Sequence, residues 1–410
     1  MAVGEFPLPT LHPVKGSLLG ATFADIKGRN PATVTRDDVV VMSFCEGSTA
    51  AGVFTKNAFC AAPVTVCKSH LGNSIRALVI NAGNANACTG DQGLADAQAT
   101  CTAMAKLAGC EEGQIMPFST GVIGEPLPLS RLVSSLPAAW STLDESNWER
   151  AARGIMTTDT RPKGASRQFD YLGCTITITG ISKGAGMIRP NMATMLAYVV
   201  TDAAIAQPVL QKILAQAADK SFNRITIDGD TSTNDSCILV ATGASDAPMV
   251  DDASGELYNL LADHIQQVLT ALAQAIVADG EGATKLVTVQ VEGGQTEKEC
   301  LRVAYSVAHS PLVKTALFAC DPNWGRIVAA IGYAGVKGLD PNKVNVFLDD
   351  VQIVANGCRA PSYSEEAGQQ VMDRSEITIG INLGRGSAAE TVWTTDFSHD
   401  YVTINAEYRT

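Results

Sequence analysis

The stretch KGAGMIRPNMATMLAYVVTD, residues 183–202, joins a loop to a strand near the middle of the chain. Glycines and a proline fill its first half, and these residues favour turns and loops. The run Leu196–Thr201 in its second half is short and continuously apolar, which is typical of a buried strand. Ala193 and Thr194 stand between the two parts, so a hydroxyl follows a small residue at the point where the loop ends.

The position of Thr194 has two interpretations, and the residues alone favour the first, that it simply caps or starts the strand. The second is a nucleophile, which needs a base to remove the hydroxyl proton. No histidine lies nearby in sequence, but the α-amine of an N-terminal residue titrates at about 8 and can serve as the base. Thr194 would become N-terminal if the Ala193–Thr194 bond were cut, and a strained loop would help its Oγ attack the Ala193 carbonyl.

Length and composition describe a globular protein of two or three domains. The chain has 410 residues, of which 46% are hydrophobic and 18% charged. A net charge of −12 argues against nucleic acid as a partner, because phosphate contacts need basic patches. The eleven cysteines are scattered and form no CxxC pair, which favours free thiols in a reducing cytoplasm. No apolar run approaches the roughly 18 residues that span a bilayer, and no secretory signal opens the chain.

Periodicity predicts an α+β fold with largely antiparallel sheets. Helical spacing is clearest in three segments: Asp91–Leu107, Pro208–Lys220 and Glu256–Ala278. His264, on the apolar face of the last of these, is interpreted as a satisfied core residue. The stretch Ser134–Asn147 has no clear period and is a candidate hinge, as is the loop before Thr194. Strands are expected at Arg76–Ala82, Cys174–Ile181, Leu196–Thr201, Arg224–Asp228, Cys237–Thr242, Leu286–Glu292, Val344–Leu348, Glu376–Leu383 and Tyr401–Glu407.

The common catalytic and metal-binding signatures are missing. The sequence has no GxxxxGK[ST], GxSxG or HExxH motif. Residues 228–235, DGDTSTND, resemble the start of a calcium loop, but Thr233 and Leu239 stand where such a loop needs Gly and Glu. This segment is therefore interpreted as a polar turn, and no metal is expected.

Several long motifs resemble those of the ornithine acetyltransferase/glutamate N-acetyltransferase family of arginine biosynthesis. The resemblance extends over essentially the whole chain, in the order of the family, and includes the signature KGAGMIRPNMATML around Thr194. The other motifs are VINAGNANACTG (79–90), MPFSTGVIGEPLP (116–128), MTTDTRPK (156–163), TIDGDTSTNDS (226–236), DGEGATK (279–285), SPLVKTALFACDPNWGRI (310–327) and YVTINAEYRT (401–410).

The resemblance implies an autoprocessed enzyme with an N-terminal-nucleophile-like αββα sandwich. Cleavage would divide the chain into an alpha fragment, 1–193, and a beta fragment, 194–410, with two copies of each in a heterotetramer. The implied reaction moves acetyl from N-acetyl-L-ornithine to L-glutamate in a ping-pong mechanism. It needs no cofactor, although some members also use acetyl-CoA as donor, and its location is cytoplasmic.

The family pattern also implies which residues act. Thr194 would be the nucleophile that cuts the chain after Ala193 and then carries the acetyl group, and Thr120 with Gly121 would form the oxyanion hole. A hydroxyl and a backbone N–H can donate together to one developing oxyanion. Lys183 suits a substrate carboxylate and Glu281 an ornithine ammonium. The implied substrate contacts are Thr157, Lys183, Thr194, Glu281, Asn405 and Thr410, of which Thr157 depends on strand phase.

Two other functions fit the same residues. An N-terminal-nucleophile amidase or aminopeptidase would share the nucleophile and the oxyanion hole but use water as the acceptor. A non-catalytic amino-acid-binding protein would keep the fold without cutting itself. Whether the protein self-cleaves and forms an acetyl-enzyme separates these alternatives.

Overall fold

The computed structural model describes residues 3–4, 6–28, 36–189 and 195–407. The chain folds into two compact units, each with its own sheets and core. The larger unit contains Pro7–Asn223 and Asp230–Ile276, and the smaller unit contains Met1–Phe6, Arg224–Gly229 and Val277–Thr410.

The larger unit contains two sheets and a set of helices. The four-stranded sheet has the order β1 (Ser17–Thr22), β2 (Val39–Phe44), β4 (Ala77–Asn84), β5 (Ile115–Val122). The five-stranded sheet has the order β3 (Thr49–Phe54), β9 (Ser236–Ala241), β8 (Leu196–Thr201), β7 (Cys174–Lys183), β6 (Lys163–Tyr171). The helices are α1 (Ala62–His70), α2 (Gly90–Ala108), α3 (Leu129–Ser141), α4 (Trp148–Gly154), α5 (Gln207–Asp219) and α6 (Glu256–Ala278).

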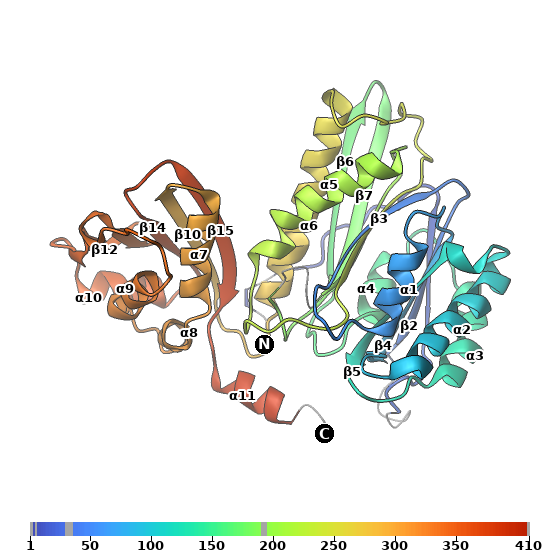
Figure 1. Cartoon of the computed structure of the whole chain (residues 1–410), viewed down its shortest axis with the longest axis horizontal. Coiled ribbons are helices and arrows are strands. Elements are labelled where there is room, and N and C mark those ends of the chain that lie inside the picture. Colours follow the sequence, from blue (N-terminus) through green and yellow to red (C-terminus); the bar gives the residue numbers. More distant parts are fainter. Residues whose placement is uncertain (1–2, 5, 29–35, 190–194, 408–410) are drawn as a thin grey trace. The chain divides into compact units, whose positions relative to one another are not determined.

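The two sheets face each other across one core. Phe118 of β5 meets Tyr198 of β8 edge to face, with ring centroids 5.1 Å apart, and β-branched and aliphatic side chains of both sheets fill the space around them. The opposite face of the four-stranded sheet packs against α2 and α3, which bury Met104 and Leu136. Helices α5 and α6 cover the outer face of the other sheet (Figure 1). The predicted αββα sandwich is therefore confirmed for this unit.

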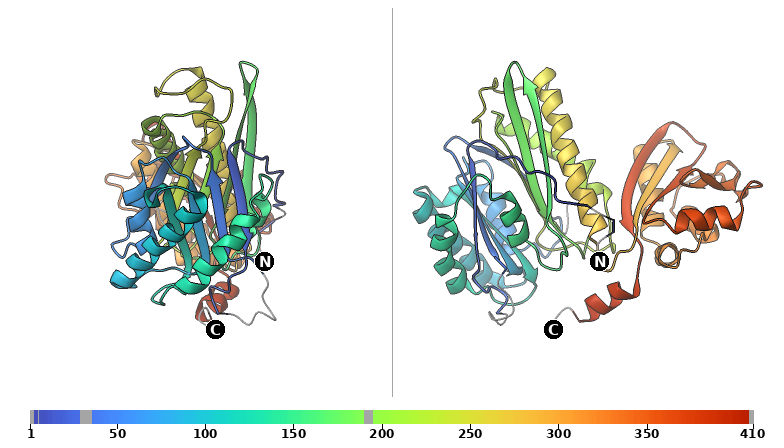
Figure 2. Two further views of the ribbon diagram at one scale, coloured as in Figure 1. Left: turned by 90° about the vertical axis from the view of Figure 1, so that its right-hand side faces the viewer. Right: turned by 180° about the vertical axis from the view of Figure 1, so that it is seen from behind.

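Helix α6 has the bounds that its periodicity predicted. It is the one helix, in the ranges that the structure describes, that is long and apolar enough to cross a membrane. Its buried side chains, such as Leu272, pack on the five-stranded sheet beside the β6–β7 hairpin (Figure 2), which is the arrangement of a core helix. His264 stacks on Phe169 of β6 at 4.5 Å. Its Nδ1 has no hydrogen-bond partner in the described part of the chain. The prediction that the hydrogen bonds of His264 are satisfied is therefore wrong for this atom, although the ring is packed.

Strand β8 lies between β7 and β9 in the middle of its sheet. It pairs antiparallel with β7, where Leu196 opposes Lys183, and parallel with β9, where Leu196 opposes Ser236. Seven of the nine predicted strands are confirmed to within two residues at each end, and these are β4, β7, β8, β9, β10, β11 and β14. The sheets are largely antiparallel, as predicted, with parallel pairs at β4–β5, β8–β9 and β10–β14.

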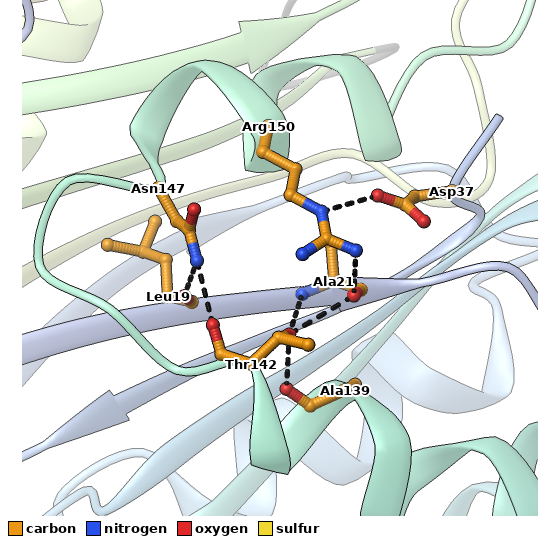
Figure 3. A network of polar contacts seen from close by, with 7 residues as sticks. All are labelled: Leu19, Ala21, Asp37, Ala139, Thr142, Asn147 and Arg150. Atoms are coloured by element: carbon orange, nitrogen blue, oxygen red, sulfur yellow. Dashed lines mark hydrogen bonds and ion pairs between the residues drawn. The ribbon is translucent and has the colours of Figure 1, made fainter.

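The predicted hinge at Ser134–Asn147 is wrong, because this segment is fixed to β1 by hydrogen bonds (Figure 3). Its first half belongs to α3. The Thr142 hydroxyl bridges β1 to the end of that helix, accepting from the Ala21 amide at 3.2 Å. Asn147 Nδ2 donates to the Leu19 carbonyl at 2.9 Å, and Arg150 binds both the Ala21 carbonyl and Asp37 at 2.7 Å. The chain passes between the units near residues 6, 223, 229 and 276 instead. The other candidate hinge, the loop before Thr194, includes residues 190–193, which lie outside the described residues.

The smaller unit is built on a six-stranded sheet. Its order is β13 (Cys358–Arg359), β12 (Val351–Ala355), β11 (Asn345–Leu348), β14 (Glu376–Asn382), β10 (Leu286–Gly294), β15 (Ala388–Thr395). Its helices are α7 (Glu297–Ala308), α8 (Pro311–Phe318), α9 (Trp324–Gly332), α10 (Glu365–Met372) and α11 (His399–Ala406). One apolar cluster, which includes Val289, Val303 and Ile379, joins the sheet to these helices.

Two strand predictions in this unit are wrong. The β-branched alternation in YVTIN predicted a strand, but these residues form α11. The Ser398 side chain caps that helix by accepting a hydrogen bond from the Tyr401 amide. This local cap outweighs the strand propensity of the β-branched residues Val402, Thr403 and Ile404. Arg224–Asp228 forms no strand either. It makes a single bridge, Ile225 to Trp393, at the edge of the sheet, and Arg224 is held there by Glu390 at 3.0 Å.

Candidate active site

The Ser119-Thr120-Gly121 segment ends β5 in a conformation that only glycine permits at its last position. Gly121 has φ +138°, and a Cβ on it would lie 2.2 Å from the Gly83 carbonyl carbon on the neighbouring strand. The two glycines oppose each other in the β4–β5 pair. The Thr120 hydroxyl and the Gly121 backbone are thus fixed at the end of the sheet, as the predicted oxyanion pair requires.

Asparagines hold this segment in place. Asn234 Nδ2, which comes from the loop before β9, donates to the Ser119 carbonyl at 2.9 Å and to the Ala85 carbonyl at 2.6 Å. The Ser119 hydroxyl donates to Asn81 Oδ1 at 2.6 Å. All these groups are buried, where a hydrogen bond left unmade is costly. The asparagine-rich motif at 79–90 and the loop at 226–236 therefore form one scaffold around Thr120.

Lys183 joins the predicted oxyanion segment to the five-stranded sheet. It is the last residue of β7, is only 9% exposed, and its Nζ donates to Thr120 Oγ1 at 3.3 Å. Because Thr120 Oγ1 accepts this bond, its own proton can be donated to another acceptor. The structure therefore brings together two residues, Lys183 and Thr120, that are 63 positions apart in sequence.

Asp159 anchors the loop that contains Thr157. Its side chain is fully buried and binds Lys163 Nζ at 2.6 Å through Oδ1. The same oxygen accepts from the Gly184 amide at 2.7 Å, and Oδ2 accepts from the Thr157 amide at 3.0 Å. Burial alone would raise the pKa of this carboxyl, but the ammonium groups of Lys163 and Lys183 and these hydrogen bonds hold it well below its usual range. Asp159 is therefore a carboxylate.

Asp235 is the second buried acid near Lys183, and its pKa is shifted in the opposite direction. It stands directly before β9 and is 3% exposed. Burial raises its pKa well above the ordinary value, and the opposing effects of the Met195 amide and of Lys183 do not offset this. Burial therefore favours the protonated form of this carboxyl.

The predicted cleavage site and one substrate residue lie outside the described residues. These are Ala193, Thr194 and Thr410. The description resumes at Met195, whose carbonyl accepts from the Ser236 amide at 3.0 Å. The first described residue after Thr194 is thus paired with the segment that carries Asp235.

Glu281 and Asn405 meet in the smaller unit. Asn405 Nδ2 on α11 donates to Glu281 Oε2 at 2.9 Å, and Glu281 is only 9% exposed. The Glu281 loop is held against the start of α11, because the Ser398 hydroxyl donates to the Gly282 carbonyl at 2.6 Å. Gly282 has φ +67°, and a Cβ there would lie 2.5 Å from the Tyr401 amide nitrogen, so only glycine fits.

A buried lysine lies under the same helix. Lys314 on α8 is 1% exposed, and its Nζ donates to Thr394 Oγ1 at 3.0 Å and to the Thr395 carbonyl. The Phe397 ring lies 4.5 Å from Nζ and stacks on Tyr401. Burial lowers the pKa of Lys314 to about 7, although Asp396 and Asp228 act in the other direction.

A comparison with protein families identifies the chain. The model described as the ArgJ family matches residues 19–410. The chain belongs to the ArgJ family. It is 60% identical over 410 residues to the arginine biosynthesis bifunctional protein ArgJ of Pseudomonas fluorescens (strain Pf0-1), and equally to that of Pseudomonas syringae pv. tomato (strain ATCC BAA-871 / DC3000). Both alignments cover 100% of this chain and 100% of the relative.

Two solved structures are also similar to parts of the chain. The arginine biosynthesis bifunctional protein ArgJ of Bacillus halodurans is 35% identical, with a TM-score of 0.49, and the match covers 51% of this chain and 97% of that one. The ornithine acetyltransferase of Mycobacterium tuberculosis, solved with ornithine, is 30% identical, with a TM-score of 0.37, over 45% of this chain and 95% of that one.

The resemblance predicted from the motifs is thereby confirmed, and this ArgJ family member is an acetyltransferase. Among its predicted site residues, the structure brings Lys183 to Thr120 and Asn405 to Glu281, and it places the Thr157 amide on Asp159. The individual roles of these residues stay predictions. In the described part of the chain, no group of three or more His, Cys, Asp and Glu side chains is arranged to hold a metal ion.

Three buried polar residues of this site were missed in the sequence. Asp159 and Asp235 stand within quoted motifs, and Asn234 stands in the segment interpreted as a polar turn. One signal was available for Asn234 and Asp235: they directly precede the strand SCILVA, which is apolar after its first residue and leads into the core. Nothing local marks Asp159, because its partners Lys163, Gly184 and Thr157 converge on it only in the fold.

Proposed function

We propose that the chain cuts itself between Ala193 and Thr194 and then transfers acetyl from N-acetyl-L-ornithine to L-glutamate through an acetyl-Thr194 intermediate. The observation that carries the proposal is the contact between Lys183 and Thr120 beside the start of β8, the strand that Thr194 precedes. An oxyanion donor and a cation for a substrate carboxylate would thus lie beside the strand that the predicted nucleophile precedes in sequence. The names of the 60% identical relatives, bifunctional proteins of arginine biosynthesis, support the same reaction.

The oxyanion hole would consist of the Thr120 hydroxyl and the Gly121 backbone N–H. Lys183 supports this role for Thr120, because the ammonium donates to its Oγ1 and leaves the hydroxyl proton for the oxyanion. The close approach of Gly121 to Gly83 and the bonds from Asn234 hold the segment rigid. A donor fixed in advance stabilises the transition state without reorganisation at the moment of reaction.

Substrate recognition would use groups suited to an amino acid. Lys183 would bind the α-carboxylate that ornithine and glutamate share, and Glu281 would bind the ornithine side-chain ammonium. Asn405, which donates to Glu281, would orient that carboxylate, and Thr157 and Thr410 would complete the contacts. Acetyl-CoA would serve as an alternative donor, and the reaction would need no bound cofactor.

The two fragments, 1–193 and 194–410, would stay together after the cut. The Ala193–Thr194 bond lies in the connection between β7 and β8, which pair from Ile178 opposite Thr201 to Lys183 opposite Leu196. Cutting this connection leaves the sheet and its core in place. Two copies of each fragment would form the assembly. A cytoplasmic location accords with eleven cysteines that are all free thiols.

The experiment is a comparison of the wild-type protein with Thr194→Ala by denaturing gel and intact mass. The wild type should separate into two fragments that end at Ala193 and begin at Thr194, and the variant should remain whole. A wild-type protein that is active as a single full-length chain would overturn the proposal. Thr201→Ala, at the far end of the same strand, is the matched control and should be cut like the wild type.

A further inference from the structure

The loop that carries Glu281 in the smaller unit is a tight turn. The Ala283 amide donates to the Gly280 carbonyl at 2.9 Å, which places Glu281 at one of the two central positions of the turn. Gly282, at the other central position, has φ +67°, a conformation that few other residues adopt. A loop directs a functional side chain only where a rigid scaffold holds it, so the groups that bind this turn decide where the Glu281 carboxylate points.

One buried acid holds the chain directly after this turn. Asp396, which follows β15 and is only 2% exposed, accepts through Oδ1 from the Thr284 amide at 2.8 Å and from the Lys285 amide at 3.0 Å. Its Oδ2 accepts from the Thr284 hydroxyl at 2.6 Å. Three donors of one short segment therefore bind a single carboxyl group, which uses both of its oxygens for them.

The same stretch of chain begins the helix that carries Asn405. Ser398 stands two residues after Asp396, and its hydroxyl donates to the Gly282 carbonyl at 2.6 Å. The hydroxyl oxygen also accepts from the Tyr401 amide at 3.3 Å and so caps α11. Residues 396–398 therefore hold the turn on one side and start the helix on the other.

Asn405 completes the connection between the helix and the turn. Its Nδ2 donates to the Tyr401 carbonyl and to Glu281 Oε2, both at 2.9 Å. Both hydrogens of this amide group are thus used, and one of the two bonds ties the side chain to the backbone of its own helix. The geometry of the Glu281–Asn405 pair therefore depends on how residues 396–398 hold the turn against α11.

We propose that Asp396 is a positioning residue for the acetyl donor: by holding the segment after the turn, it keeps the Glu281 carboxylate beside Asn405, ready for the side-chain ammonium of N-acetyl-L-ornithine. This inference rests on the proposed function, because it requires that Glu281 binds that ammonium. A charge-assisted hydrogen bond depends on geometry, so a small displacement of Glu281 weakens binding of the donor. L-glutamate has no side-chain ammonium, and its use should depend on Asp396 much less.

The test is the steady-state kinetics of Asp396→Ala and Asp396→Asn, with each substrate varied in turn. Asp396→Ala should raise the KM for N-acetyl-L-ornithine by about 30-fold, with much smaller changes in kcat and in the KM for L-glutamate. Asp396→Asn should restore most of the wild-type KM, because its amide oxygen still accepts from the two backbone amides and its NH₂ group can donate to the Thr284 hydroxyl. Asp340→Ala is the control and should keep the wild-type KM, since Asp340 binds the Asn342 amide, at 3.0 Å, in the loop before β11.

Thr284→Val is a milder change that decides the question if Asp396→Ala does not fold. Thr284 is exposed, and valine keeps its shape but removes the hydroxyl that binds Asp396 Oδ2. We expect the KM for the donor to rise about fivefold, and to rise no further when Glu281→Gln is already present. Thr175→Val is its control, because the exposed Thr175 hydroxyl makes the same kind of bond, to Asp170 at 2.7 Å, in the β6–β7 hairpin.

The outcomes separate this inference from the proposed function. If Glu281→Gln raises the KM for the donor but neither Asp396→Ala nor Thr284→Val does, the inference is overturned and the proposed function stands. The same conclusion follows if these two variants weaken the use of both substrates equally, because that is the effect of a merely structural residue. If Glu281→Gln itself leaves the KM for the donor unchanged, the proposed role of Glu281 is rejected and the inference with it.

Discussion

The two units bury lysines in opposite surroundings. In the larger unit, Lys163 binds the Asp159 carboxylate at 2.6 Å, and Lys183 acts on the same carboxylate. In the smaller unit, Lys314 Nζ donates to hydroxyl and carbonyl oxygens of Thr394 and Thr395 and lies against the Phe397 ring. Burial therefore lowers the pKa of Lys314 to about 7, whereas in the larger unit the charges support one another and Asp159 is held ionised.

This difference shows how a fold decides whether a buried group stays charged. The attraction between a carboxylate and an ammonium in contact offsets much of the free-energy cost of removing both from water. Neutral oxygens and an aromatic ring offset less of the cost of burying an ammonium. The charged cluster lies at the candidate site, where a substrate carboxylate would need a cation. The Lys314 cluster supports the helix that carries Asn405, through the stack of Phe397 on Tyr401.

Removing the shared carboxylate should have the largest effect. Asp159→Asn leaves Lys163 buried without its counter-charge, which should lower the free energy of unfolding of the larger unit by about 3–5 kcal/mol. It should also slow acetyl transfer, because the Thr157 and Gly184 amides lose the oxygens that hold them. Hydrogen exchange of β7 and steady-state kinetics measure the two effects.

The control for this variant is an ion pair on the surface. Glu149 and Arg153 on α4 are paired at 2.7 Å with more than half of each side chain exposed. Glu149→Gln should cost at most about 1 kcal/mol, since exposed pairs contribute little. If the two substitutions cost the same, the Asp159 cluster is not the tightly coupled group that the structure indicates.

The Lys314 cluster should give a smaller effect that depends on pH. The pKa of Lys314 is about 7 in the folded state and near its ordinary value of 10.5 in the unfolded state. Between these values the unfolded state holds more protons, so stability of the smaller unit should rise with pH, by up to about 1.4 kcal/mol per pH unit. Lys314→Met should remove this slope, as measured by hydrogen exchange of β15.

Lys298→Met provides the comparison for that measurement, because Lys298 is exposed on α7 of the same unit. It should leave the pH dependence unchanged. A Lys314→Met protein that keeps the wild-type slope would show that Lys314 is charged in the folded state, and that the hydroxyl oxygens stabilise an ammonium as well as Asp159 does.

The fold was predictable where the local pattern and the tertiary structure agree. Helix α6 and strand β8 have the bounds that periodicity gave, because each presents a continuous apolar surface to a core. The strand prediction for the YVTIN segment was wrong for the opposite reason. None of the residues of its helix is fully buried, so burial selects its conformation only weakly and the Ser398 cap has the larger influence.

The candidate site was predictable only in part. The motifs gave Thr120, Lys183, Glu281 and Asn405, and the structure joins them in two pairs. The burial of Asp235 was indicated in the sequence only by its place before a strand, and no local pattern indicated that its pKa is raised. The raised pKa follows from burial, and the place of Asp235 beside β8 follows from the register of β8 and β9; both are properties of the assembled sheet.

The central claim is that Thr194 carries the acetyl group from donor to acceptor. Mass spectrometry of the 194–410 fragment after incubation with N-acetyl-L-ornithine alone tests it most directly. We expect one acetyl group on Thr194 that persists in buffer and is removed far faster by L-glutamate than by water. An acetyl group discharged at the same rate with and without glutamate would indicate a hydrolase, and a fragment that never gains acetyl, or a chain that is never cut, would contradict the account.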